Sequence, residues 1–111
     1  MGVQLVLSAT GPLPVKALFN APGDMQMYLE VNGSVWSQSP NQMIGIDINL
    51  DGNTIGTAKI FSNGASTHRA VVPAFLPVQL TQGQHTLILA AASGTSTVSD
   101  VNDSYVAVIY Y

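Results

Sequence analysis

The chain has 111 residues, no cysteine and a formal net charge of −3, and only 8% of its residues are charged. The lack of cysteine excludes disulfides and thiolate chemistry, and three basic residues, Lys16, Lys59 and Arg69, are too few for the basic stripe that nucleic acids require. Because a typical soluble domain has about 25% charged residues, the low charge favours coverage of part of the surface by further subunits.

The length predicts a single domain that spans residues 1–111. No apolar run reaches the roughly 20 residues of a membrane-spanning helix, and the first residues lack the positive region of a signal peptide. We therefore expect no membrane insertion and no signal peptide in this chain. The sequence leaves the location open, although an extracellular or particle-surface location is favoured.

Short apolar or alternating runs recur about every ten to fifteen positions and are separated by turn residues, a pattern typical of β-sandwiches and barrels. In chain order, the runs predict strands at 3–7, 14–19, 25–31, 44–50, 54–61 and 68–75, the last extending loosely to 78 and interrupted by proline, and a closing pair within 84–111. The residues at 51–53 predict a tight hairpin turn, and those at 32–42 predict a polar loop that contains Trp36.

The clearest half-buried strand is 25–31. One face of it is apolar and the other presents polar or amphipathic side chains: Met25, Met27, Leu29 and Val31 against Gln26, Tyr28 and Glu30. About eight such strands predict an all-β, two-sheet antiparallel jelly-roll sandwich. An immunoglobulin-like sandwich is the alternative.

Four stretches resemble the globular heads of the tumour-necrosis-factor and complement-head superfamily in its bacterial or phage form. These stretches are YLEVNGS at 28–34, LDGNTIG at 50–56, GQHTL at 83–87 and DVNDSYVAV at 100–108. The resemblance implies a compact homotrimer with a binding or structural role and no catalysis.

The apolar terminal strand predicts the subunit interface. Tyrosine supplies area and a polar tip together, so we expect the interface at Tyr105, Ile109, Tyr110 and Tyr111. His85 alternates with leucines and is expected to face either the core or that interface.

Catalysis is not expected. Both histidines fall in predicted strands, no nucleophile-elbow motif is present, and no isolated acid–base pair is apparent. The sequence therefore predicts a protein that is not an enzyme.

A metal is indicated only weakly, at the oxygen-rich loop of Asp100, Asn102 and Asp103. Calcium needs six to eight oxygen ligands, and the alternative is that these side chains bond their own backbone as Asx turns. We expect no cofactor, with calcium as the weak exception.

Sugars are held by an aromatic face together with planar polar groups. Trp36, in its predicted polar loop, is either an exposed platform or a plug beneath the loop, and Tyr28 lines an outer groove or an interface. His68 and Arg69 are candidates for contacts with hydroxyls or carboxylates. The sequence thus predicts a recognition module for a glycan or cell-surface receptor; the alternative is a self-assembling structural component of a virion, fibre or filament.

Overall fold

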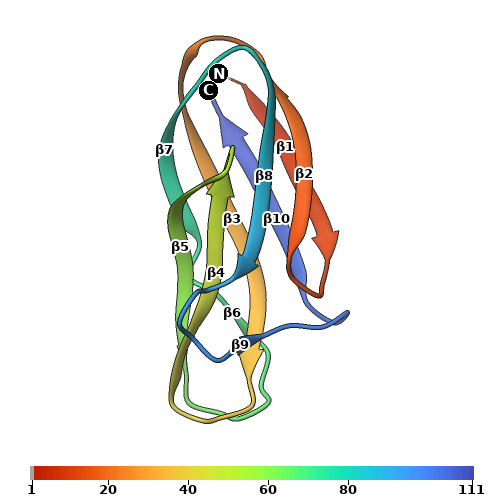
Figure 1. Ribbon diagram of the computed structural model, residues 1–111, viewed down its shortest axis with the longest axis vertical. Helices are drawn as coiled ribbons and strands as arrows, with labels where there is room; N and C mark the ends of the chain where they lie inside the picture. The colour runs from red at the N-terminus through yellow and green to blue at the C-terminus, as the bar shows by residue number, and fades with distance from the viewer. Residues whose placement is uncertain (1) are drawn as a thin grey trace.

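The computed structural model describes residues 2–111 as two antiparallel sheets packed face to face (Figure 1). The larger sheet has the order β1 (Val3–Thr10), β10 (Ser104–Tyr110) and β3 (Met25–Ser37), and its further strands β7 (Ala74–Leu80), β6 (Arg69–Ala70) and β9 (Thr97–Val98) all pair with β3. The smaller sheet has the order β2 (Val15–Ala21), β8 (Gly83–Ala91), β4 (Gln42–Leu50) and β5 (Asn53–Ser62). This arrangement confirms the predicted two-sheet antiparallel jelly-roll sandwich.

The core lies between the sheets and follows from the alternation of apolar residues along each strand. The predicted face of β3 supplies Met27, Leu29 and Val31, all at most 1% exposed. The opposing sheet contributes Ile44, Ile46 and Ile48 of β4 and Leu87 and Leu89 of β8 to the same cluster. Met25, at the start of β3, is exposed rather than buried.

The hairpin between β4 and β5 turns at Asp51 and Gly52, as the sequence predicts. Both residues have positive φ, 51° and 89°, which a two-residue hairpin of this hand requires. Asp and Gly suit these two positions because both residues tolerate the left-handed conformation.

The predicted loop at 32–42 is wrong in its first half, because β3 continues to Ser37. Beyond the part that pairs with β7, β3 pairs with β6 at Ser34 and Val35 and with β9 at Trp36 and Ser37. Gly33, which looks like a loop signal, leaves room for Tyr105: an added Cβ at this position would lie 2.4 Å from its Cδ1 atom. The glycine is therefore a close approach inside a strand rather than a turn.

The proline-interrupted run at 68–78 forms two separate strands, β6 and β7, with Pro73 between them. Pro77 lies within β7 opposite Tyr28, and β7 pairs with β3 alone. Because proline lacks a backbone donor, it is tolerated at such an edge.

Residues 2–111 include no helix that is long and apolar enough to cross a membrane.

Candidate functional site

Three aromatic side chains meet on the outward surface of the larger sheet. They are Tyr28, Phe75 and Tyr110. Leu29 and Ile109, which are the sequence neighbours of Tyr28 and Tyr110, point into the core, so the two tyrosines point outwards. The ring of Tyr28 stacks on that of Phe75 at 5.3 Å between centroids with 10° between planes, and the rings of Phe75 and Tyr110 are 5.8 Å apart at 45°. We call these three residues the aromatic cluster. Phe75 is 57% exposed and Tyr28 is 42% exposed, so the cluster is open to solvent.

Glu30 belongs to the same surface. In register it lies between Val108 of β10 and Phe75 of β7. The hydroxyl of Tyr110 donates a hydrogen bond of 2.6 Å to Glu30 Oε1. That bond raises the pKa of Tyr110 above its ordinary value, because losing the proton would place two negative charges together. The carboxylate thus fixes the orientation of one ring of the cluster.

A shallow cavity of about 230 Å³ continues this surface towards the far end of β3. It is lined by Asn32, Gly33, Ser34, Ala70, Ser104 and Val106. From Tyr28 to Asn32 the strand advances about 13 Å, at roughly 3.3 Å per residue. An aromatic surface and a recess whose exposed lining is mostly apolar, with Asn32, Ser34 and Ser104 at its walls, therefore lie in line along one strand.

The other half of this outer face is aliphatic. Val3 and Leu5 of β1 are about 60% exposed, and in the ladder they lie beside Tyr110 and Val108. The strands β1, β3, β7 and β10 contain one charged residue between them, Glu30. This part of the face is therefore almost uncharged.

Three of the four predicted ligand-binding residues gather elsewhere, near the C-terminal end of β3. The rings of Trp36 and His68 are 5.7 Å apart, and the backbone of Arg69 pairs with Val35. Tyr28 lies eight positions before Trp36 in β3, which corresponds to about 26 Å at roughly 3.3 Å per residue. The predicted set is thus divided between two places.

Trp36 is half-buried in strand β3 rather than exposed in a loop. Its Nε1 atom is buried, and no hydrogen-bond partner for it occurs within the described part of the chain. A buried indole nitrogen favours the plug over the platform, because a platform presents the ring to solvent.

His68 forms a polar cluster with two carboxylates. Its Nδ1 atom lies 2.6 Å from Asp103 Oδ1, and its Nε2 atom lies 3.6 Å from Asp100 Oδ2. The hydrogen bond to Asp103 raises the pKa of His68, and the charges of both carboxylates act in the same direction. The cluster is therefore stabilised when this histidine is protonated.

The same cluster contains Asp100 and Asp103, two of the residues weakly indicated as metal ligands. Most of their carboxylate oxygens already accept hydrogen bonds from the protein. Asp103 is fully buried; its Oδ1 also accepts from Ser34 Oγ at 2.7 Å, and its Oδ2 accepts from the Asp100 amide at 2.9 Å. Asp100 Oδ1 in turn accepts from the Asn102 amide at 2.8 Å. The bond from the Asn102 amide to Asp100 is the Asx turn of the alternative interpretation, whereas Ser34 and His68 bind Asp103 from distant parts of the chain. The donor set does not fit calcium, which needs six to eight oxygens free to bind.

The predicted interface residues are dispersed. Tyr105 and Ile109 are 0% exposed in the core of the sandwich, so they have no surface to offer another subunit, and that expectation is corrected. Tyr110 belongs to the aromatic cluster, and the backbone of Tyr111 pairs with Gly2 at the end of the sheet. His85 is buried and faces inwards, which is one of the two orientations expected for it.

Sequence reasoning missed Phe75 and the role of Glu30. The alternation of β3 placed Tyr28 and Glu30 on its outer face, but the partner of that strand is β7, which is distant in sequence. The sequence feature that could have indicated the site was Phe75, an aromatic residue in the proline-interrupted run at 68–78. Its register against Tyr28 follows only from the fold.

Comparison with known proteins gives a likeness of fold. No family model and no curated protein matches the sequence. Among solved structures, a native family 35 carbohydrate-binding module from Clostridium thermocellum matches with a TM-score of 0.53 and 15% identity, over 96% of this chain and 90% of that one. The CBM36-1 domain of a multidomain xylanase from the hindgut metagenome of Trinervitermes trinervoides matches with a TM-score of 0.54 and 14% identity, over 99% and 98%.

A third structure, the carbohydrate-binding module CBM36 in complex with calcium and xylotriose, matches with a TM-score of 0.51 and 15% identity, over 99% of this chain and 92% of that one. The chain thus has the β-sandwich fold seen in carbohydrate-binding modules. The predicted resemblance to tumour-necrosis-factor and complement heads is wrong, because the matched structures are carbohydrate-binding modules. Its four stretches are also ordinary hairpin sequences. The homotrimer, which rested on that resemblance, loses its support.

Proposed function

We propose that this chain is a non-catalytic glycan-binding module whose ligand lies on the outer face of the larger sheet. The observation that supports this most directly is the exposed aromatic cluster in line with the recess at Asn32 and Ser104. Pyranose rings present apolar faces that pack on aromatic rings, and their hydroxyls need amide and hydroxyl partners. The likeness of fold to carbohydrate-binding modules supports the same class of ligand.

The test is affinity electrophoresis in gels that contain neutral polysaccharides such as xylan, mixed-linkage β-glucan or hydroxyethyl cellulose. The wild-type chain is retarded by at least one of them, and Phe75→Ala and Tyr28→Ala each weaken binding about tenfold. An aromatic contact is worth about 0.5–1.5 kcal/mol beyond its burial, and 1.4 kcal/mol corresponds to tenfold.

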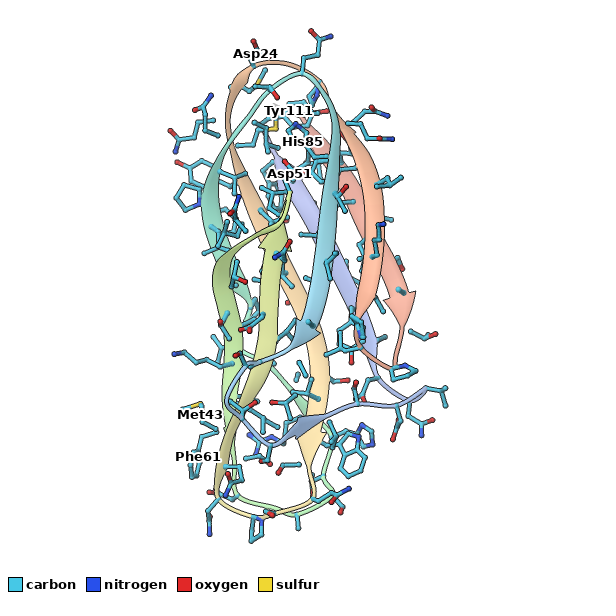
Figure 2. The ribbon with its side chains drawn as sticks, in the orientation of Figure 1. Asp24, Met43, Asp51, Phe61, His85 and Tyr111 are labelled. Atoms are coloured by element: carbon cyan, nitrogen blue, oxygen red, sulfur yellow. The ribbon has the colours of Figure 1, made fainter. Side chains whose placement is uncertain are left out.

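Phe61→Ala is the matched control. Phe61 has an exposure between those of Tyr28 and Phe75, but it lies on the outer face of the smaller sheet, opposite Met43. Figure 2 shows the two side chains together at the edge of the molecule. This variant retains full binding. Absence of retardation in every polysaccharide, or equal losses in Phe61→Ala and Phe75→Ala, would refute the proposed function and its location.

A second candidate is self-association, which the aliphatic half of the same face favours. Val3, Leu5 and Val106 are exposed without any charge nearby on their strands, and such patches mark protein interfaces. Light scattering at several concentrations tests it: an assembly that Leu5→Lys dissociates supports a structural role. A monomer at every concentration removes this candidate and leaves the glycan proposal intact.

A further inference from the structure

We propose that Glu30 sets the class of glycan: the outer face takes uncharged glycans, with Glu30 accepting a sugar hydroxyl, and rejects glycans that contain carboxylate or sulfate groups. This inference rests on the proposed function, because it names the substrate class of that same face. Its basis is the position and the bonding of Glu30, the single charged residue of strands β1, β3, β7 and β10.

Glu30 lies where a ligand on the aromatic cluster must pass. Its ladder neighbours are Phe75 on one side and Val108 on the other, and it lies between Tyr28 and Asn32 on the outward side of β3. A chain of sugars that runs from the aromatic rings to the recess therefore covers the Glu30 carboxylate. Covering it removes water from the carboxylate.

One oxygen of that carboxylate is already satisfied. Glu30 Oε1 accepts the hydrogen bond from Tyr110 Oη at 2.6 Å, whereas Oε2 has no hydrogen-bond donor among residues 2–111. An ionised carboxylate has about four acceptor sites, and an acceptor that loses water without a new donor destabilises the complex. The ligand itself must then supply a donor, and the hydroxyls of a neutral sugar do so.

An anionic ligand meets the opposite situation. The strands around Glu30, which are β1, β3, β7 and β10, contain no lysine, arginine or histidine that might pair with a ligand carboxylate or sulfate. The one basic residue in a strand of this sheet, Arg69 of β6, lies beside Ala70 at the recess, beyond Glu30 along β3. Such a group would approach Glu30 as a like charge across apolar rings, where screening by water is weakened. Discrimination of this kind depends on a repulsive element as much as on an attractive one.

Tyr110 is a positioning residue in this account. Its hydroxyl holds the carboxylate in place, and Phe75 packs against its ring. Tyr110→Phe keeps the aromatic surface and removes only the hydrogen bond. We therefore expect this variant to reduce the preference for neutral glycans while it retains binding to them.

The experiment measures affinities for matched pairs of polymers that share a backbone and differ in charge: hydroxyethyl against carboxymethyl cellulose, and unsubstituted xylan against glucuronoxylan. For the pair whose backbone binds, the wild-type chain prefers the neutral member at least tenfold at low salt, and the ratio decreases as salt screens the charges. Glu30→Gln lowers the affinity for the neutral polymer several-fold and brings the ratio close to one.

Asp24→Asn is the control for net charge. Asp24 lies in the turn before β3, at the end of the molecule in Figure 2, and its Oδ1 accepts from the Gln82 amide, a bond that asparagine retains. This variant removes the same charge as Glu30→Gln but leaves the ratio unchanged. Melting temperatures confirm that each variant is folded.

The outcomes separate the inference from the proposed function. If Phe75→Ala weakens binding about tenfold, as expected for an aromatic contact, while Glu30→Gln leaves the ratio unchanged, the face binds glycans but Glu30 does not select them, and the inference is wrong. The same holds if the wild-type chain binds both members of a pair equally. If neither member of any pair binds, the proposed function itself fails, and this inference fails with it.

Discussion

His85 Nδ1 lies 2.5 Å from Asp51 Oδ2, and His85 Nε2 lies 2.7 Å from the carbonyl oxygen of Thr81. Both ring nitrogens thus face acceptors, so the arrangement is satisfied only by the protonated imidazolium. Asp51 Oδ1 also accepts from the Thr86 amide at 2.8 Å. Figure 2 shows the pair at one end of the sandwich, where it ties the β4–β5 turn to the start of β8.

This pair predicts a pH dependence of stability with two limbs. The hydrogen bond to Asp51, and then that to Thr81, raise the pKa of His85, so its contribution is complete below the unfolded value of 6.5 and is lost as the pH rises through the folded pKa. Burial by itself would raise the pKa of Asp51, but the bonds from His85 and Thr86 outweigh it and lower the pKa below 3.8. The Asp51 contribution is therefore present above 3.8 and is lost as the pH falls through the lowered pKa.

We expect the free energy of unfolding to be greatest between about pH 4 and pH 6.5, the ordinary values of the two groups, and to decrease towards pH 8. Urea titrations at several pH values measure this change. Asp51→Asn removes the carboxylate that favours the imidazolium, costs about 1 kcal/mol at pH 5, and flattens the alkaline limb. The pKa of His68 is also raised, so this residue likewise loses its stabilising contribution as the pH rises. Part of the decrease in unfolding free energy above pH 6.5 therefore remains in the variant. A slope identical to that of the wild-type chain would contradict the assignment.

Tyr105→Phe is expected to stabilise the protein. Burial raises the pKa of Tyr105 to about 12, although the nearby Ser99 hydroxyl acts in the opposite direction. The Tyr105 hydroxyl is buried and makes no hydrogen bond of ordinary geometry within residues 2–111. Removing an unsatisfied buried hydroxyl relieves a cost of about 1–3 kcal/mol. Thermal and urea unfolding measure the gain; a loss of stability would mean that the hydroxyl has a partner in solution.

Gly33→Ala is expected to destabilise the protein by about 1–3 kcal/mol, as overpacking of a core does. The added Cβ would lie 2.4 Å from Tyr105 Cδ1, 3.0 Å from Ile46 Cδ1 and 3.1 Å from the Ser104 carbonyl oxygen. The double variant with Tyr105→Leu recovers part of the loss, because the ring is the closest obstacle. Strictly additive losses would show that the ring does not cause the clash.

The sequence was sufficient for the fold class because local signals determine it. Alternation on β3 and β4, the Asp51–Gly52 turn and the proline at an edge strand each depend on neighbours in sequence. The extent of β3 was not predictable in the same way. Gly33 and the polar residues after it resemble a loop unless Tyr105, far along the chain, is known to pack there.

The candidate site depended even more on contacts between distant residues. That Tyr28 faces outwards follows from period two, but its partner Phe75 follows only from the register of β7 against β3. Tyr105 and Tyr110 belong to one short apolar strand, and placing them at an interface ignored the alternation that sends the first inwards and the second outwards. Composition indicates few surface charges but not where the uncharged face lies, and the coverage by further subunits that it favours stays a prediction.

Asp103 provides the last prediction, which concerns a metal. Its carboxylate accepts from Ser34 Oγ, His68 and the Asp100 amide, so both of its oxygens are already engaged by the protein itself. Asp103→Asn is expected to cost about 1.5–3 kcal/mol, the usual value for hydrogen bonds to a charged group, whether or not calcium is present. Because a ligand that binds only the folded state raises its stability, the melting temperature of the wild-type chain in millimolar calcium should equal that in a chelator. An increase with calcium concentration that Asp103→Asn abolishes would show instead that the ion displaces His68 and that the loop is a metal site.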